Sequence, residues 1–255
     1  MIDLEQRFRT LRASGRKLLV PYVTGFVPGW VEAVRAAVAS GADAVEIGLP
    51  FSDPVMDGPV IQRASTIALQ RGATVNAILD EVRELDVDVP LVVMCYYNTV
   101  FRAGHERFAS LAKKAGVSGV IVPDLPLEES APWCAAADAA GLATVMLAAP
   151  TAPDARLPLI AQRSRGFVYA VGLLGITGER ETLASSATTI ARRVKDATDL
   201  PVLVGVGVSD AAQAVEACSV ADGVIQGAAI MRRLLDEGAE SVGAFVADVR
   251  RALDE

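Results

Sequence analysis

The sequence predicts an α/β protein that forms a single (β/α)8 TIM barrel over residues 1–255, with an extra N-terminal helix before the first strand. Three observations lead to this prediction. Short runs rich in Val, Ile, Leu and Ala alternate eight times with helical patterns. The length of 255 residues is typical of such barrels. No linker, low-complexity tract or change in composition divides the chain into two domains.

The eight expected strands are mostly continuous apolar runs, as is typical of parallel strands that are covered on both faces. They are Leu18–Val23, Ala44–Gly48, Pro90–Tyr96, Gly119–Val122, Ala143–Ala148, Phe167–Val171, Pro201–Val206 and Gly223–Gln226. A doubly wound open sheet is the alternative, because strand runs alone do not prove that a barrel closes.

Amphipathic helices are expected between these strands, where apolar residues recur every three or four positions. One helix has Val31, Val34 and Val38 on a common face, and Glu106–Ala115 forms another. The extra helix before the first strand is marked by Leu4, Phe8 and Leu11.

Composition narrows the class of function. A formal net charge of -7 argues against a nucleic-acid or anionic-lipid surface. No apolar run approaches the ~20 residues of a membrane span, and the acidic N-terminal residues have no apolar signal core, so a cytoplasmic location is expected. Cys95, Cys134 and Cys218 show no metal or redox spacing and are expected to be small buried or half-buried hydrophobic residues.

Two acidic residues are the strongest candidates for chemistry. Glu46 lies inside the apolar strand Ala44–Gly48, and Asp57 lies in the turn-rich loop after it. A buried carboxylate is costly unless it is paired or used, and two carboxylates in different environments can divide acid and base roles. The structural alternatives are an ion pair for Glu46 and ordinary turn chemistry for Asp57.

Several other catalytic chemistries lack the residues that they need. A Schiff-base aldolase requires a lysine at a strand end, whereas Lys17 precedes the first strand and Lys113, Lys114 and Lys195 lie on helical patterns. His105 is the single histidine, which disfavours a metal-dependent aldolase and a Ser-His-Asp hydrolase, and no metal site is expected. The chemistry that remains is acid–base catalysis by carboxylates, acting on a substrate that carries its own electron sink.

Glycines follow the later strands at positions suited to an anion. They are Gly178, Gly205, Gly207 and Gly227. Glycine lets backbone N–H groups approach a phosphate closely, and a helix starting near Gly227 directs its positive end toward the same place. Tight turns between strand and helix are the alternative explanation.

The run Val-Glu-Ile-Gly-Leu-Pro-Phe-Ser-Asp-Pro-Val-Met-Asp-Gly-Pro-Val-Ile-Gln, residues 45–62, resembles the signature of the tryptophan synthase alpha subunit family. The resemblance extends from the Val-Pro-Tyr-Val-Thr-Gly strand to the last helix. It implies a lyase of tryptophan biosynthesis that cleaves indole-3-glycerol phosphate, by a retro-aldol reaction, to indole and glyceraldehyde 3-phosphate. It makes Glu46 and Asp57 the catalytic acids, with no cofactor in this chain.

The resemblance also assigns roles. Glu46 would deliver a proton to indole C3 and remove one from the glycerol hydroxyl, with a pKa raised by the apolar barrel mouth. Asp57 would stabilise positive charge at the indole N–H. Substrate contacts are expected at Tyr22, Tyr96, Tyr169 and Thr177, although Tyr169 has a core aromatic role as its alternative. Phosphate contacts are expected at Gly178, Gly205, Gly207, Gly227 and Ala228.

A partner follows from the same resemblance. Pro50, Asp53, Pro54 and Asn98 would form the docking face for a beta subunit, in an alpha-beta-beta-alpha heterotetramer. Pyridoxal phosphate would belong to that beta subunit, which receives the indole through a tunnel.

The chain departs from the family pattern near the expected mouth. Ala228 stands where serine is usual, Thr99 where proline is common, and Gly172 where serine is frequent, while Leu173 and Leu174 make the following loop more apolar. These departures keep open a free-standing lyase that needs no beta subunit. Two further alternatives are a catalytically weak regulator that binds and activates a beta subunit, and a phosphosugar isomerase of similar architecture.

Overall fold

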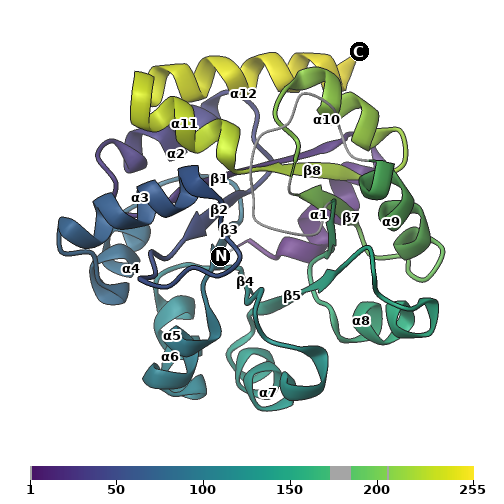
Figure 1. Ribbon diagram of the computed structural model, residues 1–255, viewed down its shortest axis with the longest axis horizontal. Coiled ribbons are helices and arrows are strands. Elements are labelled where there is room, and N and C mark those ends of the chain that lie inside the picture. The colour runs from purple at the N-terminus through teal and green to yellow at the C-terminus, as the bar shows by residue number, and fades with distance from the viewer. Residues whose placement is uncertain (1, 173–184, 206) are drawn as a thin grey trace.

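The computed structural model describes residues 2–172, 185–205 and 207–255. Eight parallel strands follow one another around a closed barrel, with the helices outside it (Figure 1). The strands are β1 (Leu18–Thr24), β2 (Val45–Gly48), β3 (Leu91–Met94), β4 (Gly119–Ile121), β5 (Ala143–Ala148), β6 (Val168–Val171), β7 (Val202–Gly205) and β8 (Gly223–Gln226). The pairing of β8 with β1 closes the ring. The predicted barrel is therefore confirmed, and the open sheet is wrong.

The helices form the outer layer. They are α1 (Leu4–Ala13), α2 (Trp30–Ala39), α3 (Pro59–Gln70), α4 (Val75–Arg83), α5 (Tyr97–Ala103), α6 (His105–Lys114), α7 (Ala131–Ala140), α8 (Leu157–Arg163), α9 (Ser185–Lys195), α10 (Ala211–Cys218), α11 (Ala228–Glu237) and α12 (Ala239–Asp254). Two short 3-10 helices, η1 (Leu127–Glu129) and η2 (Asp154–Arg156), follow β4 and β5. No helix within the described residues has the length and apolar character that a membrane span requires.

The barrel interior is filled by side chains from every strand or the residue just before it. This cluster contains Leu18, Val20, Ala44, Val92, Ile121, Val145, Phe167, Leu203 and Ile225. A larger cluster packs between the strands and the surrounding helices. Each strand is thus covered on both faces, which is why its sequence reads as a continuous apolar run.

Helix α1 closes the N-terminal end of the barrel. Its residues Leu4 and Phe8 belong to the interior cluster, and the rings of Phe8 and Phe167 have centroids 5.6 Å apart. A Cβ at Gly166 would clash with the Leu4 side chain, so glycine allows this close approach. The carboxylate of Asp3 caps the helix by accepting from the Gln6 N–H at 2.8 Å.

Several element boundaries differ from the sequence prediction. β3 ends at Met94 rather than at Tyr96, because Tyr96 is already the N-cap of α5 and the N–H of Tyr97 bonds to Asp124 at 2.8 Å. Val206, the expected end of β7, lies outside the described residues.

The face of α2 differs as well. Val34 is buried, but Val31 and Val38 are only half-buried, because Trp30, Ala33 and Ala37 complete the buried face of this helix. The helix expected at Glu106–Ala115 is confirmed as α6. All three cysteines are free and buried, as expected.

Candidate active site

Glu46 lies in β2, where its side chain is almost completely shielded from solvent. Only 4% of the residue is exposed, and its Oε2 atom has no hydrogen-bond partner. Burial, followed by the nearby negative charge of Asp57, raises the pKa of Glu46 to about 8. A buried carboxyl group with an orphaned oxygen and a raised pKa makes Glu46 a candidate for acid–base chemistry.

Asp57 lies in the loop between β2 and α3, and its loop is fixed by Tyr96. The backbone N–H of Met56 donates to the Tyr96 hydroxyl at 3.0 Å, and the ring of Phe51 stacks on Tyr96 with centroids 5.0 Å apart. The carbonyl of Asp57 accepts from the Gln62 side chain at 2.8 Å. Burial raises the pKa of Asp57 to about 6, although the hydrogen bond from the Tyr96 hydroxyl acts in the opposite direction.

Two tyrosines on different strands, Tyr22 on β1 and Tyr169 on β6, interact electrostatically with the acids. Burial is the largest cause of the raised pKa of Tyr22 and of Tyr169, and the charges of Asp57 and Glu46 raise both further. The Tyr22 hydroxyl accepts from the Thr24 hydroxyl at 3.2 Å. The structure thus brings Glu46, Asp57, Tyr22 and Tyr169 into one site at the carboxyl ends of the strands.

Each tyrosine hydroxyl occupies the space next to a glycine. A Cβ at Gly48 would clash with the hydroxyl of Tyr22, and a Cβ at Gly205 would clash with the hydroxyl of Tyr169. The sequence analysis missed Thr24 and Gly48 as parts of the site. No signal in the sequence identifies them, because both depend on strand register, which pairs Tyr22 with Glu46 and Thr24 with Gly48.

The glycines expected to bind the phosphate differ in whether their position requires glycine. Gly207 has a φ of 90° and open space around its Cβ position, so it needs glycine for its conformation. Gly205 is needed beside Tyr169, whereas Gly227 has a φ of -106° and room for a Cβ. Helix α11 begins at Ala228 with Gly227 as its N-cap, as the sequence predicted, so its free N–H groups face the loop after β8.

Other expected contacts lie outside the described residues. These are Thr177 and Gly178; Leu173 and Leu174, which depart from the family pattern, also lie outside the described residues. Gly172 is described: its N–H donates to the carbonyl of Gly205 at 2.8 Å, which joins the end of β6 to that of β7.

The residues expected at the partner face lie at the surface beside the site. Asp53 and Asn98 are exposed, while Pro50 and Pro54 are half-buried. Val55 is 71% exposed in the same loop, and Phe101 is 63% exposed on α5 with Asn98. These two large apolar side chains were not singled out from the sequence, because a single exposed hydrophobic residue is not recognisable before the fold is known.

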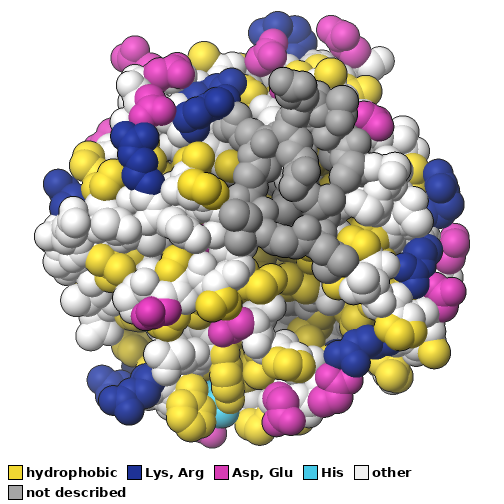
Figure 2. Space-filling model, viewed as in Figure 1, with side chains coloured by type: hydrophobic (Ala, Val, Ile, Leu, Met, Phe, Trp, Pro, Cys, Tyr) yellow, Lys and Arg dark blue, Asp and Glu magenta, His cyan; other side chains and the backbone are white. Residues whose placement is uncertain are grey.

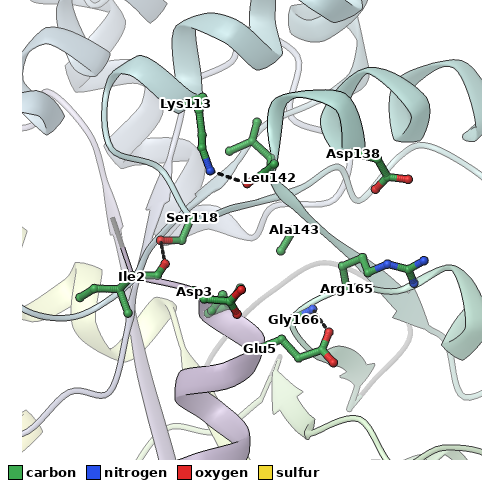
Figure 3. A pocket seen from close by; sticks show the side chains of 12 residues that line it. Ile2, Asp3, Glu5, Lys113, Ser118, Asp138, Leu142, Ala143, Arg165 and Gly166 are labelled. Atoms are coloured by element: carbon green, nitrogen blue, oxygen red, sulfur yellow. Dashed lines mark hydrogen bonds between the residues drawn. The ribbon is translucent and has the colours of Figure 1, made fainter.

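A polar cavity of about 540 Å³ lies beside α1, at the amino ends of the strands and away from the two acids. Three hydrogen bonds join polar groups of its lining (Figure 3). The Ser118 hydroxyl donates to the Ile2 carbonyl at 2.8 Å, and Glu5 accepts from the Gly166 N–H at 3.1 Å. These bonds fasten α1 to the barrel. Within the described ranges, no group of three or more His, Cys, Asp and Glu side chains is placed to hold a metal.

Comparison with known proteins agrees with this geometry over the whole chain. The family model described as tryptophan synthase alpha chain matches residues 8–251. The tryptophan synthase alpha chain of Streptomyces coelicolor is 46% identical over 260 residues, covering 98% of this chain and 96% of the relative. That of Rippkaea orientalis is 39% identical and covers 100% and 99%. A structure of Mycobacterium tuberculosis tryptophan synthase has a TM-score of 0.91 and 38% identity, covering 98% of this chain and 97% of that one. The chain therefore belongs to the tryptophan synthase alpha chain family.

Proposed function

We propose that Glu46 and Asp57 catalyse the cleavage of indole-3-glycerol phosphate to indole and glyceraldehyde 3-phosphate. Membership of the family makes the chain a lyase of tryptophan biosynthesis. The observation that carries the residue assignment is the buried pair of carboxyl groups at the barrel mouth, whose pKa values are raised to about 8 and about 6. Near neutral pH this difference leaves Glu46 protonated and Asp57 ionised, so one acts as acid while the other carries negative charge.

Glu46 moves both protons of the reaction. Its protonated carboxyl group donates to C3 of the indole, which gives a cationic indoleninium. The resulting carboxylate takes the proton of the glycerol hydroxyl on the attached carbon. That carbon becomes the aldehyde of glyceraldehyde 3-phosphate, the bond to C3 breaks, and its electron pair returns to the ring as indole leaves. A pKa near the working pH suits a group that must both give and accept a proton.

Asp57 stabilises the charge that this sequence creates. The indoleninium carries its positive charge at the ring nitrogen, so an ionised carboxylate that accepts from the indole N–H favours the intermediate over the neutral substrate. The bonds between Tyr96 and the Asp57 loop hold this carboxylate in place before the substrate binds.

The phosphate is held by backbone groups rather than by net charge. The N-terminus of α11 at Gly227 and Ala228, together with the loops at Gly205 and Gly207, supplies N–H groups at the usual phosphate position of such barrels. Ala228 retains its backbone N–H and lacks the hydroxyl usual in the family, a loss of about 1 kcal/mol. Thr177 and Gly178 complete the proposed substrate contacts. All of these steps use side chains and backbone alone, so the chain needs no cofactor of its own.

The partner we propose is a tryptophan synthase beta subunit, which would carry the pyridoxal phosphate. The exposed apolar side chains of Val55 and Phe101 adjoin Asp53 and Asn98 and would be covered in an alpha-beta-beta-alpha assembly. This observation favours a subunit over a free-standing lyase. A cytoplasmic location stays a prediction.

Indole release from indole-3-glycerol phosphate, measured with and without a beta subunit, tests the proposal. Slow release by the chain alone and release faster by orders of magnitude with the partner are expected. Glu46→Gln and Asp57→Asn should each lose more than about 100-fold of the rate, while Glu32→Gln on the outer face of α2 should retain it. Near-normal turnover in either site variant would contradict the catalytic roles, and fast release without a partner would favour the free-standing lyase.

A further inference from the structure

An apolar cavity of about 460 Å³ opens at the barrel mouth, over the carboxyl ends of β4 and β5. Figure 2 shows hydrophobic side chains gathered in a hollow next to the grey atoms. The cavity walls come from the loops after these two strands, from α8 and from the loop after β2. Among the lining residues are Met56, Leu125, Met146, Leu147, Ile160 and Val171.

The cavity adjoins the catalytic acids. Met56, which lines it, immediately precedes Asp57, and its N–H is fixed by the Tyr96 hydroxyl at 3.0 Å. On the other wall, Leu147 lies beside Tyr169 in the pairing of β5 with β6. The cavity therefore lies next to the site that holds Glu46 and Asp57, with neighbours of Asp57 and of Tyr169 in its walls.

Barrel order separates the proposed phosphate site from this cavity. The proposed phosphate contacts follow β7 and β8, whereas β4 lies across the closed ring from β8 and β5 is two strands away from β7. The glycerol phosphate is attached at C3, and in the proposed mechanism Asp57 meets the ring N–H on the five-membered ring. On this basis the six-membered ring would lie away from the phosphate, toward the loops after β4 and β5.

The lining favours an uncharged, apolar occupant. The charged groups at the rim already have partners: Arg156 pairs with Glu128, and Asp124 accepts from the backbone N–H of Tyr97 at 2.8 Å. A cavity of ~150 Å³ is enough for benzene in another protein, so about 460 Å³ exceeds what one six-membered ring fills.

We propose that this cavity accepts apolar substituents on the six-membered ring of the indole, so that the substrate class includes ring-substituted indole-3-glycerol phosphates. The inference rests on the proposed function, because it depends on the indole lying between the two acids. One methyl-sized group in an apolar pocket changes kcat/KM by roughly 10-fold or more, so the response of such substrates to changes in the cavity is measurable.

The test compares kcat/KM for indole-3-glycerol phosphate with that for its 5-chloro and 6-chloro forms. For the unchanged chain, at least one chloro form should be cleaved within about threefold of the parent substrate. Ala149→Leu narrows the cavity from the half-buried position just after β5. It should lower the ratio of chloro form to parent by at least about 10-fold. Ala155→Leu, at an exposed position of η2 outside the cavity, is the matched control and should leave the ratio unchanged.

Each outcome decides the matter. Cleavage of the parent with both chloro forms more than about 30-fold slower overturns the inference and leaves the proposed function standing. An unchanged ratio in Ala149→Leu overturns the assignment to this cavity. Absence of cleavage of any substrate, even with a beta subunit, overturns the proposed function and the inference with it. If Ala149→Leu does not fold, calorimetric binding of 6-chloroindole to the unchanged chain decides, because binding weaker than that of indole contradicts an open cavity.

Discussion

At Glu46, burial and a neighbouring negative charge act in the same direction on the carboxyl group. Both raise its pKa to about 8, while Asp57, which receives a hydrogen bond from Tyr96, is raised only to about 6. The proposed mechanism needs Glu46 protonated and Asp57 ionised. We therefore expect a bell-shaped pH dependence of kcat/KM that rises through about pH 6 and falls through about pH 8. A profile that keeps rising above pH 8 would show that protonated Glu46 is not required.

Gly48 shapes the site through the side chain that packs over it. The Tyr22 side chain leans across it, and a Cβ there would clash with the tyrosine ring and hydroxyl. Gly48→Ala should lower the free energy of unfolding by about 1–3 kcal/mol. In a Tyr22→Leu background the same change should cost at least about 1 kcal/mol less, because the clash is gone. Urea unfolding of the four proteins measures this coupling. Gly227→Ala, where a Cβ has room, is the control for stability, and equal costs in both backgrounds would refute the explanation.

The loop between β2 and α3 is the element on which the chemistry depends. The single hydroxyl of Tyr96 accepts from the Met56 N–H and donates to Asp57. Tyr96→Phe removes both bonds, so kcat/KM should fall by about 10-fold or more. The acid limb of the pH profile should also move upward from about 6, because the bond that lowers the pKa of Asp57 is lost. Tyr97→Phe, which removes a hydroxyl bonded to His105, is the matched control. An unmoved acid limb would mean that Tyr96 acts only through packing.

At the scale of elements, the sequence predicted the strands well and their ends less well. Continuous apolar runs located all eight strands, because a strand covered on both faces needs them. The predicted strand extends to Tyr96, because the apolar run continues beyond Met94. Cys95 and Tyr96 are in fact buried like the residues of β3. Only the helix cap and the bond to Asp124 end the strand there, and both depend on contacts with a distant segment.

The candidate site also divides into residues that the sequence identified and residues that it did not. Glu46 and Asp57 are candidates from the sequence because a carboxylate inside an apolar strand is costly, and the resemblance over residues 45–62 assigns a role to each. Thr24 and Gly48 are not, since their part depends on which residues become neighbours across β1 and β2. The same holds for Val55 and Phe101, whose exposure is a property of the folded surface.

For the whole molecule, the two ends of the barrel have separate tasks. The carboxyl ends of the strands hold the acids and tyrosines, whereas the amino ends are closed by α1 and by bonds between buried charged groups. A net charge of -7 gives no general attraction for a phosphate, so the local N–H groups at the mouth must supply it. The apolar runs in the sequence could not show that the eight strands close into a barrel, because closure depends on the pairing of β8 with β1.

Arg250, which is 6% exposed, joins helix α12 to the amino ends of the barrel strands. Its Nη1 donates to the carbonyl of Lys17 at 2.7 Å and lies 3.3 Å from Asp43, which in turn accepts from the Leu19 N–H at 2.9 Å. Arg250→Ala would leave Asp43 buried with one cationic partner fewer. Because Arg16 still pairs with Asp43, we expect the free energy of unfolding to fall by about 1.5–3 kcal/mol.

The neighbouring Arg251 provides the control, because it also pairs with an aspartate but is exposed on the surface. Arg251→Ala should change the free energy of unfolding by less than about 0.5 kcal/mol in the same urea titration. Below the unfolding transition, Arg250→Ala should retain the kcat for indole release, since Arg250 lies at the end of the barrel away from Glu46. Equal destabilisation by the two substitutions would mean that the buried charges contribute no more than a surface pair, and a loss of kcat in the folded protein would mean that the two ends of the barrel are coupled.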